Sequence, residues 1–268
     1  MKKTNKFFAL ALMAVAMVFA SCSKDDDVNN VPSQKEIETK IIGKWKSTMD
    51  MGMHKGEVLT NGRVIYSYNA DHTGFASHSA RTPEGYSWDN KSPFSFSLKG
   101  NVLSEKPEGE HIMERSFKIT AIDDNSMTNE LSMPAMPDEE KMPALVMTFT
   151  KVTADYSKDI IGLWEGVEMT GYETYGNAEH RILYNADGTY VYFVKSGDDW
   201  VPSSNVDNEY NVDGDWLATR WRPEAGKDYN YEWWDIGEIK EGTMKWSALR
   251  EKEDGSRFTT TFTWKKVK

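Results

Sequence analysis

The sequence has a single cysteine, Cys22, among 268 residues, so no disulfide can form within the chain. It also has no apolar run of transmembrane length, because the longest, residues 7–20, is shorter than the roughly 17–25 residues that a spanning helix needs. Basic residues are in the minority, 32 against 42 acidic ones, and the net charge of −10 disfavours nucleic acid as a partner. Any attachment to a membrane is therefore expected to use a lipid.

Motifs typical of catalytic sites are also lacking. The chain has no Gly-x-Ser-x-Gly, no His-Glu-x-x-His and no glycine-rich phosphate loop, so we expect no enzyme activity and no cofactor. Four of the five histidines lie in the first half of the chain: His54, His72, His78 and His111. Since His72 and His78 would stand about 20 Å apart on an extended strand, they cannot bind one ion, and we expect no metal site.

The N-terminus has the features of a signal peptide. Three lysines, Lys2, Lys3 and Lys6, precede the apolar run, which ends at the small residues before Cys22. We therefore expect residues 1–21 to be removed on export. The sequence Val-Phe-Ala-Ser-Cys at 18–22 resembles the lipobox of bacterial lipoproteins. The resemblance implies that the Cys22 thiol carries diacylglycerol and its amine a palmitate-type acyl chain, which together anchor the chain to a membrane.

Residues 22–38 combine the acylated cysteine with an acidic flexible tether. Ser-Lys-Asp-Asp-Asp at 23–27 is followed by a polar stretch with too little apolar area to fold. The acidic run resembles the signal that sends some lipoproteins of Gram-negative bacteria to the cell surface, which implies an outer-membrane location. A solvated charge run on a protein that stays on the periplasmic face is the alternative.

The rest of the sequence is an internal repeat. Ile-Ile-Gly-Lys-Trp at 41–45 recurs as Ile-Ile-Gly-Leu-Trp at 160–164. Four further blocks match in the same order: 63–73 with 181–189, 96–103 with 210–217, 117–127 with 234–244, and 148–150 with 261–263. We therefore predict two related domains, residues 39–153 and 156–268, each with its own core.

Both copies have the pattern of β-strands. Apolar residues alternate with polar ones, as at Phe94, Phe96 and Leu98, which is typical of a half-buried antiparallel strand. Tight hairpins are expected at the three dipeptides Asp187-Gly188, Asp213-Gly214 and Asp254-Gly255. The helical candidates are short, at 34–42 and, in the second copy, at 154–161. The sequence thus predicts an all-β protein with two tandem antiparallel barrels of about eight strands each.

The order of these features is similar to that of lipocalin-like domains. A short helical segment, then Ile-Gly-x-Trp at the first strand, then a Tyr-Asn-Ala-Asp-x-Thr hairpin occurs in both copies. The resemblance implies that Trp45 and Trp164, each two residues after Gly43 and Gly162, close the bottom of a barrel as structural plugs.

Large aromatic side chains distinguish the second copy from the first. Trp216, Trp221 and Trp233 stand where the first copy has Val102, short polar residues and Ser116. Because large rings are costly to leave in water, these three tryptophans are the candidate ligand-contacting residues. Alternation along a strand places Trp233 and Trp234 on opposite faces, so packing between the domains is an equally weighted explanation.

Two functions fit these features. The first is a lipid-anchored surface protein that captures a small apolar or amphipathic ligand in the second domain. The second is an interaction module with filled barrels that recognises a glycan or a protein through exposed aromatic residues. The sequence indicates neither the ligand nor the oligomeric state.

Overall fold

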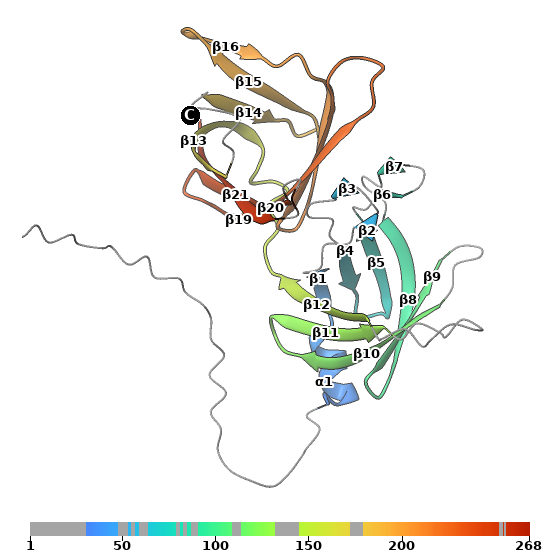
Figure 1. Cartoon of the computed structure of the whole chain (residues 1–268). Coiled ribbons are helices and arrows are strands. Elements are labelled where there is room, and N and C mark those ends of the chain that lie inside the picture. The colour runs from blue at the N-terminus through green and yellow to red at the C-terminus, as the bar shows by residue number, and fades with distance from the viewer. Residues whose placement is uncertain are drawn as a thin grey trace, which may run out of the picture. The chain divides into compact units, whose positions relative to one another are not determined.

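The computed structural model describes residues 31–47, 53–54, 57–58, 64–78, 81–82, 85–86, 91–108, 114–131, 145–171, 179–251, 254 and 256–268. The described residues contain one helix, α1 (Gln34–Lys40), and otherwise strands and turns. The all-β, antiparallel fold predicted from the sequence is confirmed (Figure 1). The predicted signal peptide and Cys22 lie outside the described residues.

The strands of the first copy form a closed barrel of eight strands in the order β1-β12-β11-β10-β9-β8-β5-β4. They are β1 (Gly43–Ser47), β4 (Val64–Tyr68), β5 (Thr73–His78), β8 (Lys91–Lys99), β9 (Val102–Pro107), β10 (Arg115–Ile122), β11 (Ser126–Leu131) and β12 (Leu145–Val152). Two short hairpins lie outside this sheet: β2 (Met53–His54) with β3 (Glu57–Val58), and β6 (Arg81–Thr82) with β7 (Gly85–Tyr86).

The strands of the second copy form one sheet of nine strands in the order β16-β15-β14-β13-β21-β20-β19-β18-β17. They are β13 (Gly162–Thr170), β14 (His180–Tyr184), β15 (Tyr190–Ser196), β16 (Asp199–Pro202), β17 (Val206–Asp213), β18 (Trp216–Arg222), β19 (Asn230–Lys240), β20 (Thr243–Glu251) and β21 (Arg257–Lys266). The expected hairpin turns at Gly188 and Gly214 are present, both with positive φ, whereas Gly255 lies outside the described residues.

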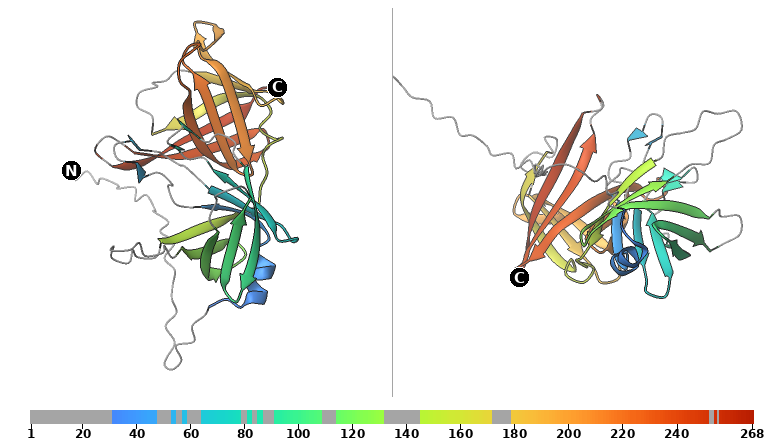
Figure 2. Two further views of the ribbon diagram at one scale, coloured as in Figure 1. Left: turned by 90° about the vertical axis from the view of Figure 1, so that its right-hand side faces the viewer. Right: turned by 90° about the horizontal axis from the view of Figure 1, so that it is seen from below.

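The second sheet curls without closing along its length (Figure 2). Its last strand, β17, meets the residue before β15 at an isolated bridge between Glu209 and Thr189, next to which the Tyr210 amide donates to the Gly188 carbonyl at 2.7 Å. Strand β17 has an irregularity between Val206 and Glu209, with Asp207 at a φ of 53°. A bulge of this kind bends a strand away from its neighbour, so only part of β17 reaches β15.

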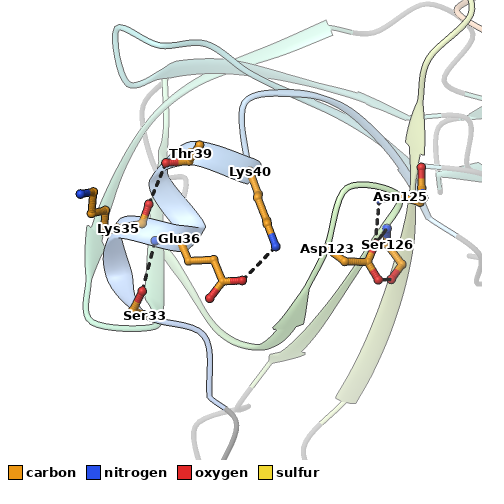
Figure 3. A network of polar contacts seen from close by, with 8 residues as sticks. All are labelled: Ser33, Lys35, Glu36, Thr39, Lys40, Asp123, Asn125 and Ser126. Atoms are coloured by element: carbon orange, nitrogen blue, oxygen red, sulfur yellow. Dashed lines mark hydrogen bonds and ion pairs between the residues drawn. The ribbon is translucent and has the colours of Figure 1, made fainter.

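Helix α1 lies across one end of the closed barrel (Figures 1 and 2). Ser33 caps it, since its hydroxyl accepts from the Glu36 amide at 3.3 Å, and Lys40 pairs with Glu36 at 2.9 Å (Figure 3). Ile37 and Ile41 are fully buried in the barrel core. The folded part therefore starts at the helix, before the boundary at residue 38 expected for the tether. In the second copy, residues 157–160 form a turn in place of the expected helix.

The two copies share their geometry where the first strand begins. The indole nitrogens of Trp45 and Trp164 each donate to a backbone carbonyl four residues earlier at 2.7 Å, and both rings are fully buried. Lys151 and Lys266 lie over these rings at 5.0 Å. Because Lys151 and Lys266 hold equivalent positions, the residues two places before them, Phe149 and Trp264, are also equivalent. The sequence match of 148–150 with 261–263 was therefore wrong by two residues.

The glycines before these tryptophans also match. Gly43 and Gly162 have φ values of 125° and 126°, a conformation that favours glycine. A Cβ at either position would stand within 3.2 Å of the Cε of the lysine that covers the tryptophan. Backbone conformation and packing account for both glycines, as expected for residues with a structural role.

Candidate ligand-binding site

A network of charged and phenolic side chains lies inside the closed barrel, among its apolar core residues. The Tyr68 hydroxyl donates to the Glu105 carboxylate at 2.6 Å, and Arg115 pairs with the same carboxylate at 3.1 Å. Glu105 is fully buried, and burial raises the pKa of its carboxyl, while Tyr68 and Arg115 act in the opposite direction. Tyr66 and Phe94 pack against the Tyr68 ring at centroid distances of 6.1 and 5.6 Å.

Strand register identifies the equivalent positions in the second sheet. In the barrel, Leu103 pairs with Phe117, and two residues further Glu105 pairs with Arg115. In the second sheet Leu217 pairs with Trp234, and two residues further Thr219 pairs with Glu232. These two lists match position by position: Thr219 replaces Glu105 and Glu232 replaces Arg115. The Tyr68 equivalent is Tyr184, since each pairs with the glycine that begins the first strand, Gly43 or Gly162.

The concave face of the second sheet encloses a cavity of about 130 Å³ at these positions. Its walls are mainly aromatic, and it is open to solvent on one side. The lining comes from seven strands and the segment before β17: Met169, Ile182, Tyr184, Tyr190, Tyr192, Asn205, Thr219, Trp221, Glu232, Trp234, Trp246, Phe262 and Trp264. An apolar cavity of about 150 Å³ holds a benzene molecule, so this one has the size of a single ring.

Stacked and tilted rings build the floor of the cavity. The Trp246 ring contacts Trp234 at a centroid distance of 5.4 Å and Trp264 at 4.9 Å, and Tyr184 lies 6.3 Å from Trp246. All four rings are buried, with exposed fractions of 6% or less. Such a floor favours a planar or apolar face of a ligand.

Polar groups are placed among these rings. The Glu232 carboxylate pairs with Arg250 at 3.6 Å, and the Arg250 guanidinium lies 4.5 Å above the Trp234 ring. The hydroxyl of Tyr192 lies 2.7 Å from Nδ1 of His180. Burial lowers the pKa of His180 and raises the pKa of Tyr184 well above 10, so both side chains are neutral at pH 7.

Three donors in this cavity have no acceptor within the described part of the chain. They are the Tyr184 hydroxyl and the indole nitrogens of Trp246 and Trp264. A buried donor without an acceptor costs roughly 1–3 kcal/mol. Strand register explains why the Tyr184 hydroxyl has no acceptor: Thr219 stands where the first copy has Glu105, the carboxylate that accepts from Tyr68.

The structure separates the three tryptophans that the sequence singled out. Trp221 lines the cavity. Trp216 and Trp233 lie on the other face of strands β18 and β19, with exposed fractions of 2% and 5%, in a cluster with Ala218 and Ile65 of β4. Ile65 itself points away from the barrel core, which its neighbours Val64 and Tyr66 join. Packing between the two copies therefore accounts for Trp216 and Trp233.

Ion pairs surround this cluster between the copies. Lys46 of β1 pairs with Asp215 at 2.9 Å and with Asp235 at 2.8 Å, and Lys44 pairs with Asp213. Within the second copy, the Tyr156 amide donates to the Gly214 carbonyl at 2.9 Å, next to Asp213 and Asp215. Asp213 at the end of β17 and Asp215 in the turn after it thus serve contacts between the copies.

Sequence reasoning missed most of the cavity. Tyr184, Glu232, Trp246 and Trp264 were not identified as site residues. The signal was present in the repeat itself, because Tyr184 matches Tyr68, and the strands after Trp234 carry further large rings on the same face. Across the described residues no three histidine, cysteine or carboxylate side chains gather to hold a metal ion. No helix described by the structure has both the length and the apolar character to cross a membrane.

These features define an all-β protein with a closed eight-stranded barrel and a curled nine-stranded sheet that holds an aromatic pocket. No protein-family model and no curated protein sequence matches the chain. Among solved structures, it is similar to a protein of unknown function from the DUF3598 family of Nostoc punctiforme. The two chains are 14% identical, with a TM-score of 0.27, over 88% of this chain and 100% of the other. The site is therefore interpreted from the residues of this chain alone.

Proposed function

We propose that the protein is a lipid-anchored binding protein of the outer membrane, exposed at the cell surface, that captures a small apolar or amphipathic ligand in the pocket of its second sheet. The lipid anchor is at Cys22 and the tether follows it. The observation that carries the proposal is the difference between the copies. In the first copy Tyr68, Glu105 and Arg115 bond to one another at these interior positions, whereas the equivalent positions of the second sheet line a ring-sized aromatic cavity.

The alternative function, recognition of a glycan or a protein by exposed aromatic residues, finds less support. Of the three tryptophans that distinguish the second copy, two are buried against Ile65, and Trp221 lines the cavity. The surface they would supply is therefore taken up by contacts within the chain.

Calorimetric titration with toluene tests the proposal, because toluene has the size of the cavity and no polar group. The protein carrying Cys22→Ala serves as the starting form, since it needs no detergent that would compete for the pocket. We expect saturable binding that weakens at least about fivefold in Trp221→Ala. Trp200→Ala is the matched control, because Trp200 packs under Arg181 at 4.1 Å and is not part of the lining. Absence of binding by toluene and by the hydroxylated probe described below would refute the proposed function.

A further inference from the structure

The pocket carries a specific polar signature in addition to its aromatic walls. In the first copy, the buried Tyr68 hydroxyl donates to Glu105 at 2.6 Å. Its counterpart Tyr184 is fully buried and lines the cavity, yet no residue described by the structure accepts from its hydroxyl. Burial, with smaller effects from Tyr190, Tyr210 and Glu232, raises the Tyr184 pKa, so the hydroxyl keeps its hydrogen at neutral pH. The Tyr184 hydroxyl is therefore a hydrogen-bond donor for a ligand in this cavity.

Two indole donors stand beside this hydroxyl. The rings of Trp246 and Trp264 are 4.9 Å apart, and Trp246 is 6.3 Å from Tyr184. Both are at least 94% buried, and within the described residues neither nitrogen has an acceptor. A ligand that brings acceptor atoms into the cavity would satisfy these buried donors, which otherwise cost free energy in the folded state.

The charges at the cavity balance one another. Glu232 occupies the position of Arg115, and its carboxylate pairs with Arg250 at 3.6 Å. One carboxylate and one guanidinium leave no charge for a ligand to neutralise, and an added charge would be buried at a high cost. The carboxylate also provides an acceptor for a ligand hydroxyl, since an ionised carboxylate has several acceptor positions.

We propose that the pocket binds a neutral, ring-sized group that carries a hydroxyl. This inference rests on the proposed function and specifies its ligand. The ring lies against Trp234, Trp246 and Trp264. The hydroxyl oxygen accepts a hydrogen bond from Tyr184, and the hydroxyl hydrogen is donated to Glu232. A phenol and a sugar ring share this chemistry, and a larger ligand would insert such a ring as its end.

Calorimetry with four probes that differ by one substituent tests the inference: toluene, p-cresol, 4-methylbenzoate and 4-methylbenzylammonium. We expect p-cresol to bind at least about tenfold more tightly than toluene, because it gains one hydrogen bond from Tyr184 and one to the Glu232 carboxylate, and the two charged probes to bind more weakly than p-cresol. Tyr184→Phe should reduce the p-cresol advantage to about threefold or less and leave toluene binding unchanged. Tyr68→Phe, the same change in the first copy, should leave the p-cresol advantage intact.

Each other outcome has a defined meaning. Equal binding of toluene and p-cresol would overturn the inference while the proposed function stands, because the pocket would then bind apolar rings without using its polar groups. Tightest binding by 4-methylbenzoate would identify an anion site at Arg250, and tightest binding by 4-methylbenzylammonium a cation site at Glu232. Either result would also overturn it. Titration with methyl β-glucoside distinguishes a phenol from a sugar ring as the natural ligand group, since only a pocket for sugar rings binds this glucoside more tightly than p-cresol.

Discussion

Glu105 and Arg115 form an ion pair of 3.1 Å inside the closed barrel, directly opposite each other on neighbouring strands. The same positions in the second sheet hold Thr219 and Glu232. A duplicated framework has thus kept its strands and its buried tryptophans while the polar content of one interior changed. The copy without this internal pair contains the aromatic cavity at the same positions, and this difference leads to the first two predictions.

Removal of Arg115 should destabilise the barrel in a pH-dependent way. Arg115→Leu leaves the fully buried Glu105 carboxylate without its cation, which should cost about 3–5 kcal/mol at pH 7. Burial already raises the Glu105 pKa above 4.5, and loss of Arg115, which lowers it, raises it further. A group with a raised pKa in the folded state contributes stability below its unfolded pKa and loses it as the pH rises through the folded value. Urea unfolding should therefore show the deficit shrinking as the pH falls towards 4.5.

The control for this variant removes the charge. In Glu105→Gln combined with Arg115→Leu, residue 105 is neutral at all pH values, so the free energy of unfolding of this double variant should lack the pH dependence that Glu105 gives to Arg115→Leu. A deficit of Arg115→Leu that is the same at pH 4.5 and pH 7 would show that Glu105 is not ionised in the folded barrel.

The two equivalent tyrosines should respond differently to loss of their hydroxyls. Tyr68→Phe removes the donor to a buried carboxylate and should lower the free energy of unfolding by about 1–3 kcal/mol. Tyr184→Phe removes a hydroxyl with no acceptor among the described residues and should change it by less than about 0.5 kcal/mol or increase it. Thermal and urea unfolding measure both. A large loss in Tyr184→Phe would indicate an acceptor in a segment outside the described residues.

Much of the fold followed from local patterns, since strand alternation and the Asp-Gly turns depend on a few neighbouring residues. Strand alternation also placed Trp233 and Trp234 on opposite faces. The inward face was not predictable, because both faces of β18 and β19 are apolar and only the contact with Ile65, over 150 positions earlier in the sequence, distinguishes them. The pocket was missed because matching Glu105 with Thr219 and Arg115 with Glu232 requires two different sequence offsets. The two copies have loops of unequal length, so equivalent residues are not a constant distance apart in the sequence. The match becomes visible only from the strand register.

The lipid anchor is tested by Cys22→Ala. Cys22 is the only cysteine, so the variant has no thiol to acylate and should move from the membrane fraction to the soluble fraction. Its unfolding transition should match that of the parent protein, because Cys22 precedes helix α1, the first described element, by more than ten positions in the sequence. Persistence of the variant in the membrane fraction would contradict a lipid anchor at this residue.

Alanine substitutions of three tryptophans in the second sheet should have different effects on stability and on ligand binding. Trp216→Ala and Trp233→Ala remove buried rings packed with Ile65 and should each lower the free energy of unfolding by about 3–5 kcal/mol. Trp221→Ala removes a partly exposed ring from the cavity wall and should cost less than about 1 kcal/mol while weakening p-cresol binding at least about fivefold. Ile65→Ala serves as a control in the first copy, since it reduces the same contact without a change in the second sheet. If Trp216→Ala keeps full stability and loses p-cresol binding, the ring contacts ligand and does not serve the contact between the copies.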